Sequence, residues 1–558
     1  MHRDLDVSVN LQQLILGLSA REQSPVLGYR TVFRSFRRNY AELSRSIRAI
    51  GDWLTRQGIT QGDRVVFWGP NSPDWVAAFL ACLAAGVAAV PLDLHSAPDF
   101  VERVLDETAA KLLLRGRFQP HVAGVHLVRF FDELEWEARP GKPERTTWPS
   151  ITPSDLAEII YTSGTTARPR GVMLTHENLS ANLNAIQSIV PPEPFYRFVS
   201  LLPLSHALEQ MVGLFLPLSR GGEIIYIQSL KPSALVEALR QEKPNVLVVV
   251  PRFLDLLRAR FRSGLPPTVY TALTWSIPIR LALRLIARRV TAFPILRQLG
   301  GQLLYVVVGG APLDIDLERF WDSLGLLVLQ GYGLSEAAPV VSANTPTCHR
   351  IGSVGKPVAG VQVSIGKDEE ILVRGPNVTP GYYHRPGATA EAFVDGWLRT
   401  GDLGRFDRRG FLFILGRLKD LIITSAGLKI YPEDIETVLN RQPAVRDSVA
   451  LEWNGRIFAV LLLNPAVIAD PGKIIERANK QLNPVQRIQE WAVWPGSDFP
   501  RTPTLKVQKY LVREALASNR TTPANPNRPT GRVERIVADL APDRPVTPTA
   551  RLGIELDL

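Results

Sequence analysis

The alternation of apolar, strand-like runs with amphipathic helical patterns over residues 1 to about 415 constrains the fold most. Examples are the apolar runs at residues 64–68, 246–250 and 303–308, each followed by glycine or proline and then by a helical pattern. This order is typical of layered α/β architecture. At 558 residues the chain is also too long for a single core. We therefore expect several domains, the first being a large multilayer α/β domain.

The pattern changes after residue 415, which indicates three further parts. Residues 416–517 read as a small α+β domain. Residues 518–531 form a polar, proline-rich stretch typical of a linker, and residues 532–558 carry one amphipathic helical pattern. One helix cannot bury a core, so this last part is either a frayed tail or the start of a further domain.

Composition favours an ordinary globular protein of a reducing compartment. The chain is 45% hydrophobic and 21% charged, and it has only two cysteines, too few for a disulfide framework. The N-terminal residues lack the apolar core of a signal peptide, so we expect a cytoplasmic protein. The longest uncharged run, residues 75–92, contains Gly86 and Pro91 and is short for a bilayer. We interpret it as a buried helix (75–85) followed by a strand (87–92).

The formal net charge of +10 leaves two interpretations open. Arginines gather at positions 252–262 and again at 280–297, where leucine and isoleucine alternate with them. This pattern suits a helix lying on the inner, anionic face of a membrane, or equally a solvated surface helix. Nucleic acid is a poor candidate partner because no motif that reads bases is present.

Residues 161–172, Tyr-Thr-Ser-Gly-Thr-Thr-Ala-Arg-Pro-Arg-Gly-Val, suggest a phosphate-binding loop. Hydroxyls and free backbone N–H groups crowd around a glycine, between a strand expected at 156–161 and a helix expected to begin near Thr175. It is not the nucleoside-triphosphatase P-loop, because the Gly-Lys-Ser/Thr ending is missing. By itself, a solvated turn would explain the segment equally well.

Five further motifs follow in order along the chain. Each has a simple structural explanation alone, as a turn, a strand end or a solvated charge. They are Gly309-Gly-Ala-Pro-Leu313, Gln330-Gly-Tyr-Gly-Leu-Ser-Glu336, Thr400-Gly-Asp402, Gly416-Arg-Leu-Lys-Asp420 and Arg501-Thr-Pro-Thr-Leu-Lys506.

The six motifs together resemble the adenylate-forming superfamily of acyl-CoA synthetases, acyl-acid ligases and luciferases. The resemblance covers residues 25 to 515. Residues 203–210, 331–346 and 424–432 look most like long-chain fatty acyl-CoA synthetases. The resemblance to this superfamily implies a large N-terminal domain (1–415) and a small domain (416–517) that rotates about a hinge. It also implies activation of a fatty acid by ATP and Mg²⁺, with CoA as acceptor.

The resemblance assigns roles to particular residues. Lys506, Glu336, Thr165 and Ser335 would be catalytic, with Glu336 carrying Mg²⁺. The residues implied for nucleotide binding are Thr162, Ser163, Gly164, Thr166, Gly310, Ala311, Tyr332, Gly333, Asp402 and Arg417. For thiol transfer, Lys419 would be the hinge and Gly427 would face the thiol. His206 would line the acyl side, although a packed core histidine stays open.

Four positions depart from the superfamily's pattern. Ala167 and Ala426 replace glycine, Arg170 replaces lysine, and Leu505 stands where glycine is common, although fatty acyl enzymes share that leucine. None removes a charged catalytic group, so we expect an active enzyme. A catalytically silent nucleotide-binding module is the alternative of another class.

Residues 532–558 resemble the opening helix and loop of an acyl carrier protein, ending before the serine that would bear phosphopantetheine. This resemblance raises a second acceptor for the acyl group, the phosphopantetheine thiol of a carrier protein. A chance amphipathic tail is the simpler alternative.

Overall fold

The computed structural model describes residues 10–31, 34–125, 127–134, 147–162, 169–191, 196–228, 232–264, 292–423, 429–502 and 505–518. Its contacts divide the chain into two compact units. Unit 1 comprises residues 1–419 with 501–507, and unit 2 comprises residues 420–500 with 508–558. Residues 519–531 of the predicted linker and the whole carrier-like segment lie outside the described residues, as do Ala167, Ala426 and residues 280–289 of the second arginine cluster.

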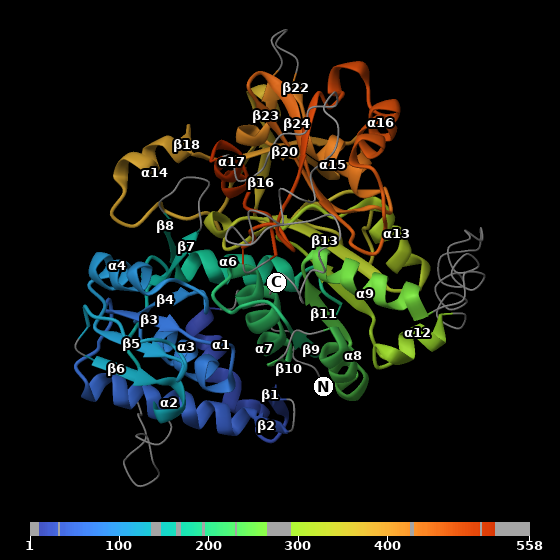
Figure 1. Cartoon of the computed structure of the whole chain (residues 1–558). Helices are drawn as coiled ribbons and strands as arrows, with labels where there is room; N and C mark the ends of the chain where they lie inside the picture. Colours follow the sequence, from blue (N-terminus) through green and yellow to red (C-terminus); the bar gives the residue numbers. More distant parts are fainter. Residues whose placement is uncertain are drawn as a thin grey trace, which may run out of the picture. The chain divides into compact units, whose positions relative to one another are not determined.

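Unit 1 contains a six-stranded sheet with the order β6-β5-β3-β4-β7-β8. All neighbours are parallel except β7 and β8, which form an antiparallel hairpin. The strands are β3 (Arg64–Trp68), β4 (Ala88–Leu92), β5 (Leu112–Arg115), β6 (Leu127–Phe130), β7 (Leu156–Thr162) and β8 (Arg170–Thr175). Figure 1 draws β3 to β6 in blue and cyan.

A second, nine-stranded sheet has the order β15-β14-β13-β12-β11-β9-β10-β1-β2. Its central strands, β13 to β1, are parallel. The strands are β1 (Pro25–Arg30), β2 (Ser35–Asn39), β9 (Arg197–Ser200), β10 (Glu223–Ile227), β11 (Val246–Val249), β12 (Tyr305–Val308), β13 (Leu327–Gly333), β14 (Val340–Ala343) and β15 (Lys356–Pro357). Figure 1 draws β9 to β11 in green.

Helices cover these sheets, and a third, antiparallel sheet completes unit 1. The helices are α1 (Leu11–Gly17), α2 (Tyr40–Arg56), α3 (Pro73–Ala84), α4 (Pro98–Thr108), α6 (His176–Gln187), the π-helix η3 (Glu209–Phe215), α7 (Leu216–Arg220), α8 (Pro232–Glu242), α9 (Pro251–Gly264), α12 (Phe293–Gln298), α13 (Ile315–Ser323) and α14 (Pro386–Ala392). The third sheet holds β16 (Gln362–Ile365), β17 (Glu370–Arg374), β18 (Phe393–Val394), β19 (Trp397–Phe406) and β20 (Leu412–Arg417).

The uncharged run forms the helix and strand that we expected. Helix α3 begins after Ser72, whose side chain accepts a hydrogen bond from the backbone N–H of Trp75, and Pro73 occupies the first turn. Its residues are buried almost throughout, and β4 follows directly. Within the part of the chain that the structure describes, no helix combines the length and the apolar character needed to span a bilayer.

Unit 2 is a small α+β unit with its own apolar core. Strand β24 pairs with β23 in antiparallel and with β25 in parallel orientation, and β21 and β22 form a short hairpin. The elements are β21 (Ile422–Ile423), β22 (Lys429–Ile430), β23 (Val445–Trp453), β24 (Arg456–Leu463), β25 (Glu490–Val493), α15 (Pro432–Asn440), α16 (Pro471–Gln481) and α17 (Lys509–Ala517). The predicted class, a large α/β unit with a smaller α+β unit, is confirmed.

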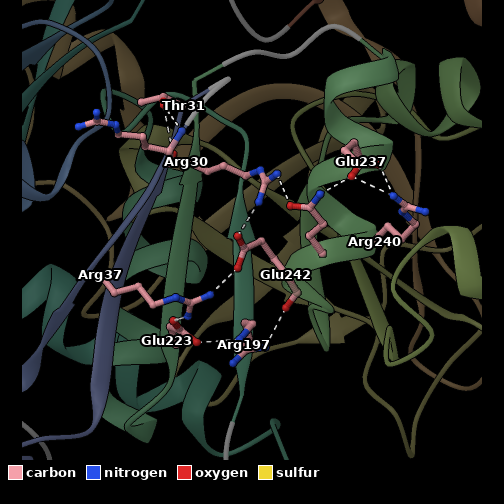
Figure 2. Close-up of polar contacts among 10 residues, drawn as sticks. Arg30, Thr31, Arg37, Arg197, Glu223, Glu237, Arg240 and Glu242 are labelled. Atoms are coloured by element: carbon pink, nitrogen blue, oxygen red, sulfur yellow. Dashed lines mark hydrogen bonds and ion pairs between the residues drawn. The ribbon is translucent and has the colours of Figure 1, made fainter.

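An arginine–glutamate cluster joins four strands and a helix of unit 1 (Figure 2). We use this name for Arg30, Arg37, Arg197, Glu223 and Glu242. Arg30 contacts Glu242 at 3.0 Å, Arg197 contacts Glu223 at 2.7 Å, and Arg37 pairs with both glutamates. Both carboxylates are buried, and each meets two arginines. The cluster therefore ties β1, β2, β9 and β10 to the end of α8.

Candidate active site

Tyr332, Asp402 and Arg417 come from three strands and meet side chain to side chain. The antiparallel register of β19 and β20 places Arg417 opposite Asp402. The Tyr332 hydroxyl donates a hydrogen bond of 2.9 Å to Asp402 Oδ2, and Arg417 Nε lies 2.9 Å from Oδ1. Burial and the charge of Asp402 raise the pKa of Tyr332, so the tyrosine keeps its proton and donates. The fold thus gathers three residues that the sequence analysis had assigned to one site.

Glu336 lies in the short helix η4 (Ser335–Ala337), directly after β13, with Ser335 beside it in the same turn. Its carboxylate accepts a hydrogen bond of 3.0 Å from the hydroxyl of Tyr382. Desolvation raises the pKa of Glu336, and hydrogen bonds, including the one from Tyr382, act against that rise. The positive charge of Arg417 also lowers the pKa of Glu336, and the negative charge of Asp402 raises it.

The phosphate-type loop connects two paired strand ends. Strand β7 ends at Thr162 and β8 begins at Arg170, and these two residues are partners in the antiparallel register. The guanidinium carbon of Arg170 lies 5.4 Å from the ring centre of Tyr382. The other predicted phosphate-binding residues, Ser163, Gly164, Thr165 and Thr166, lie outside the described residues.

Two predicted glycines have a backbone reason to be glycine. Gly310, exposed just after β12 and next to the half-buried Ala311, has a φ of +80°, which L side chains rarely adopt. A Cβ atom on Gly333 would lie 2.0 Å from the carbonyl oxygen of Pro339. At Gly310 the positive φ therefore favours glycine, and at Gly333 the close approach of the Pro339 backbone leaves no room for a side chain.

His206 lies just before the π-helix η3. Its Nε2 is 3.9 Å from Asp93 Oδ2, and desolvation lowers the pKa of His206 while Asp93 opposes that shift. Two residues further on, Leu208 comes within 2.9 Å of the place where a Cβ on Gly309 would stand. The segment with His206 is thus a neighbour of the Gly309–Ala311 turn, and its role stays a prediction.

An apolar cavity lies on the same sheet face as this turn. Side chains of alternate residues point to one face of a strand, so Tyr305 and Val307 on β12 share their face with Gly309. On β13, Leu329 likewise shares its face with Gly331. The cavity is lined by Ile189, Val190, Pro191, Tyr196, Phe198, Val212, Leu216, Val246, Tyr305, Val307, Leu329, Asn344, Thr345 and Pro346. Apolar side chains thus extend down the sheet from the glycine turn.

Lys506 belongs to the segment 501–507, which groups with unit 1. The backbone N–H of Lys506 donates to Thr502 Oγ1 at 3.2 Å, and its carbonyl accepts from Thr502 at 2.8 Å. The preceding Leu505 has a φ of +62° and packs against the core of unit 1. This explains why glycine suits that position. Lys419 is the last residue of the long stretch of unit 1, and Gly427 lies outside the described residues.

The residues present suit a magnesium ion that is held together with a nucleotide. Across the described ranges, no three His, Cys, Asp or Glu side chains gather closely enough to form a metal site by themselves. Mg²⁺ often takes only one or two protein carboxylates and completes its shell with substrate phosphates and water. The half-buried carboxylate of Glu336 fits that requirement.

Known proteins resemble this chain in sequence and in fold. The sequence profile of the AMP-binding enzyme family matches residues 21–383. FadD15, a long-chain-fatty-acid–CoA ligase of Mycobacterium tuberculosis (strain ATCC 25618 / H37Rv), is 30% identical over 556 residues, covering 86% of this chain and 91% of the ligase. A feruloyl-CoA synthase of Amycolatopsis sp is 32% identical over 421 residues, covering 73% and 78%. The crystal structure of ATP-bound MatB from Rhodopseudomonas palustris superposes with a TM-score of 0.76 at 26% identity, covering 91% of this chain and 99% of MatB.

The chain therefore has the fold of an adenylate-forming enzyme. The chain belongs to the family of AMP-binding enzymes.

Sequence reasoning missed Tyr382 and Leu208. Gly381-Tyr-Tyr383 carries no signal beyond an aromatic pair after a glycine, and Leu208 looks like any core leucine. Their contacts with Glu336 and with Gly309 join segments far apart in the sequence, so only the tertiary structure identifies them.

Proposed function

We propose that this protein activates a fatty acid with ATP, releasing pyrophosphate and forming acyl-AMP, and then transfers the acyl group to the thiol of CoA. The observation that carries the proposal is the meeting of Tyr332, Asp402 and Arg417, with Glu336 in the turn that follows the strand of Tyr332. It supplies an aromatic face, a buried carboxylate for a ribose diol and a second carboxylate for a metal ion, all next to a predicted phosphate loop.

The chemistry follows from the poor reactivity of a carboxylate. Oxide is not a leaving group, so the acid must first attack the α-phosphate of ATP, after which AMP can leave. Two anions have to meet, so fixed N–H dipoles and cations lower the barrier. In this proposal the loop from Thr162 to Thr166 holds the β- and γ-phosphates and Ser335 binds the α-phosphate. Lys506 bridges carboxylate and α-phosphate, and Mg²⁺ on Glu336 neutralises phosphate charge.

Nucleotide recognition would use the remaining site residues. Tyr332 would stack on adenine beside Gly310, Ala311 and Gly333. Asp402, held by Arg417, would accept hydrogen bonds from both ribose hydroxyls. For the second step, unit 2 would turn about Lys419 and bring the Gly427 segment toward the thiol.

The apolar cavity favours a fatty acid as substrate. Tyr305 and Val307 of β12 line the cavity, so an acyl chain bound there would extend along this strand. Apolar side chains line that path, and several similar proteins are long-chain-fatty-acid–CoA ligases. His206 and Leu208 would border the entrance. The carrier-protein acceptor and contact with an anionic membrane stay predictions.

Exchange of labelled pyrophosphate into ATP, measured with fatty acids of increasing length, tests the activation step. We expect exchange that depends on the fatty acid and on Mg²⁺. If no chain length supports exchange and Lys506→Ala behaves like the wild type, the protein is a catalytically silent nucleotide-binding module. Offering CoA and a holo-carrier protein separately then identifies the acceptor by the thioester formed.

A further inference from the structure

The segment Thr379–Tyr383 connects the strand that leaves the phosphate loop with the turn that carries Glu336. Along β8, Tyr383 N–H donates to Gly171 O at 2.8 Å, Met173 N–H donates to Gly381 O at 3.1 Å, and Val172 and Tyr382 form an isolated β-bridge. At the other end, Thr379 N–H donates to the carbonyl of Glu336 at 2.8 Å. Backbone bonds thus fix this segment on both sides.

Tyr382 adds side-chain contacts in both directions. Its hydroxyl donates to Glu336 Oε1 at 3.0 Å, and the guanidinium of Arg170 lies over its ring at 5.4 Å. Within the described part of the site, this half-buried ring therefore contacts both a residue at the end of the phosphate loop and the carboxylate proposed for Mg²⁺.

We propose that Tyr382 is a positioning residue that holds the Glu336 carboxylate and the Arg170 guanidinium in register. The inference rests on the proposed function. By donating to Oε1, the hydroxyl orients the Glu336 carboxylate, which would hold Mg²⁺. The ring also supports Arg170 next to the loop that would hold the β- and γ-phosphates.

This arrangement gives a reason for arginine at position 170, where lysine is usual in the superfamily. A planar guanidinium can lie over an aromatic face and still direct N–H groups outward, whereas a lysine ammonium is a compact, strongly hydrated charge. Arg170 can therefore keep its place over Tyr382 and offer donors toward the loop.

Titration calorimetry on the full chain tests the inference through affinity for ATP, with Mg²⁺ and with the metal chelated. Tyr382→Phe keeps the ring and removes the bond to Glu336. We expect Mg²⁺–ATP to bind roughly 10-fold more weakly, because the loss of a hydrogen bond to a charged group typically lowers affinity by about that factor. Affinity for metal-free ATP should change less than about twofold. Tyr383→Phe, which removes a hydroxyl from the neighbouring residue, is the matched control and should bind like the wild type.

Two further variants separate positioning from general damage. In a Glu336→Gln background, Tyr382→Phe should cause no additional loss of Mg²⁺–ATP affinity, because the two residues act as one unit. Arg170→Lys should lower the affinity for Mg²⁺–ATP by roughly two- to fivefold in the wild-type background. The same substitution should leave the affinity unchanged in a Tyr382→Leu background. Thermal unfolding of each apo variant should stay close to that of the wild type.

Equal affinity of wild type and Tyr382→Phe for Mg²⁺–ATP would overturn the inference. An equal loss with and without the metal ion would overturn it too, because that result indicates a structural role only. These titrations require no turnover. Absent pyrophosphate exchange in the wild type would therefore count against the proposed function, and an unchanged Tyr382→Phe affinity against this inference.

Discussion

Glu223 and Glu209 are both fully buried in unit 1, but their surroundings differ. Glu223 belongs to the arginine–glutamate cluster and contacts Arg37 and Arg197 (Figure 2). Glu209, on the π-helix η3, is desolvated, and its pKa rises to about 8 although Ser200 and the backbone of Leu202 act against the rise. Glu158 on β7 likewise has a pKa raised to about 8 by burial.

The difference shows that burial alone does not decide the charge of a carboxyl group. A nearby guanidinium keeps a buried carboxylate ionised, whereas a carboxyl without a cation stays protonated at neutral pH. The cluster is therefore an ionic connection between secondary-structure elements. The π-helix η3 carries the neutral carboxyl group of Glu209, and its Val212 lines the apolar cavity.

The largest expected effect comes from breaking the cluster. Glu223→Gln leaves Arg37 and Arg197 without the carboxylate between them, so we expect the free energy of unfolding to fall by about 3–5 kcal/mol. Chemical denaturation measures it. Glu237→Gln, at an exposed glutamate paired with Arg240, is the control and should change stability by less than about 1 kcal/mol. A similar loss in the free energy of unfolding for both variants would contradict the difference expected between a buried and an exposed ion pair.

The second effect has the opposite sign and depends on pH. The pKa of Glu209 is about 8 in the folded protein, above its ordinary value, so between these two values the unfolded chain loses a proton that the folded chain keeps. This group thus makes stability fall as pH rises from about 4.5 to 8. Glu209→Gln removes the effect, and we expect the variant to gain up to about 3 kcal/mol at pH 7 and nothing near pH 4.5. Parallel stability curves for variant and wild type over this range would refute the protonated state.

Lys506→Ala should affect the reaction and leave stability almost unchanged. Removing one transition-state donor costs about 10²-fold or more in rate, equivalent to roughly 2.7 kcal/mol. The half-exposed side chain contributes little to folding. Pyrophosphate exchange and thermal unfolding measured on the same preparation check both statements. Lys480→Ala, on the exposed face of α16, is the control and should keep full activity.

The smallest effect concerns the apolar cavity beside η3. Val307→Trp would fill it, so we expect kcat/KM to fall about tenfold for a long-chain fatty acid and to change little for a short one. Pyrophosphate-exchange rates of wild type and variant, measured with fatty acids of increasing length, show whether the loss depends on chain length. A uniform loss for all lengths would mean that the acyl chain lies elsewhere.

Much of the fold could be predicted because its cause is local. Strand β3 begins and ends as expected, and α6 starts after Thr175, whose side chain caps the helix in a reciprocal capping box. The buried nature of α3 also follows from a continuous apolar run. In these places burial and hydrogen bonding involve residues near each other in the sequence, so the pattern suffices.

The sequence by itself determined the family-like order of motifs, the layered α/β class and the choice of Tyr332, Asp402, Arg417 and Glu336 as members of one site. Only the tertiary structure decided which side chains complete that site and how buried charges behave. Tyr382 contacts Glu336, which lies 46 positions earlier in the chain, and Leu505 takes a positive φ. Burial raises the pKa of Glu209, whereas Glu223 contacts two arginines. Such facts depend on which distant segments meet. A sequence motif specifies which chemical groups are present. Tertiary packing decides which side chains become neighbours, and these neighbours set the rotamers and pKa values of the site residues.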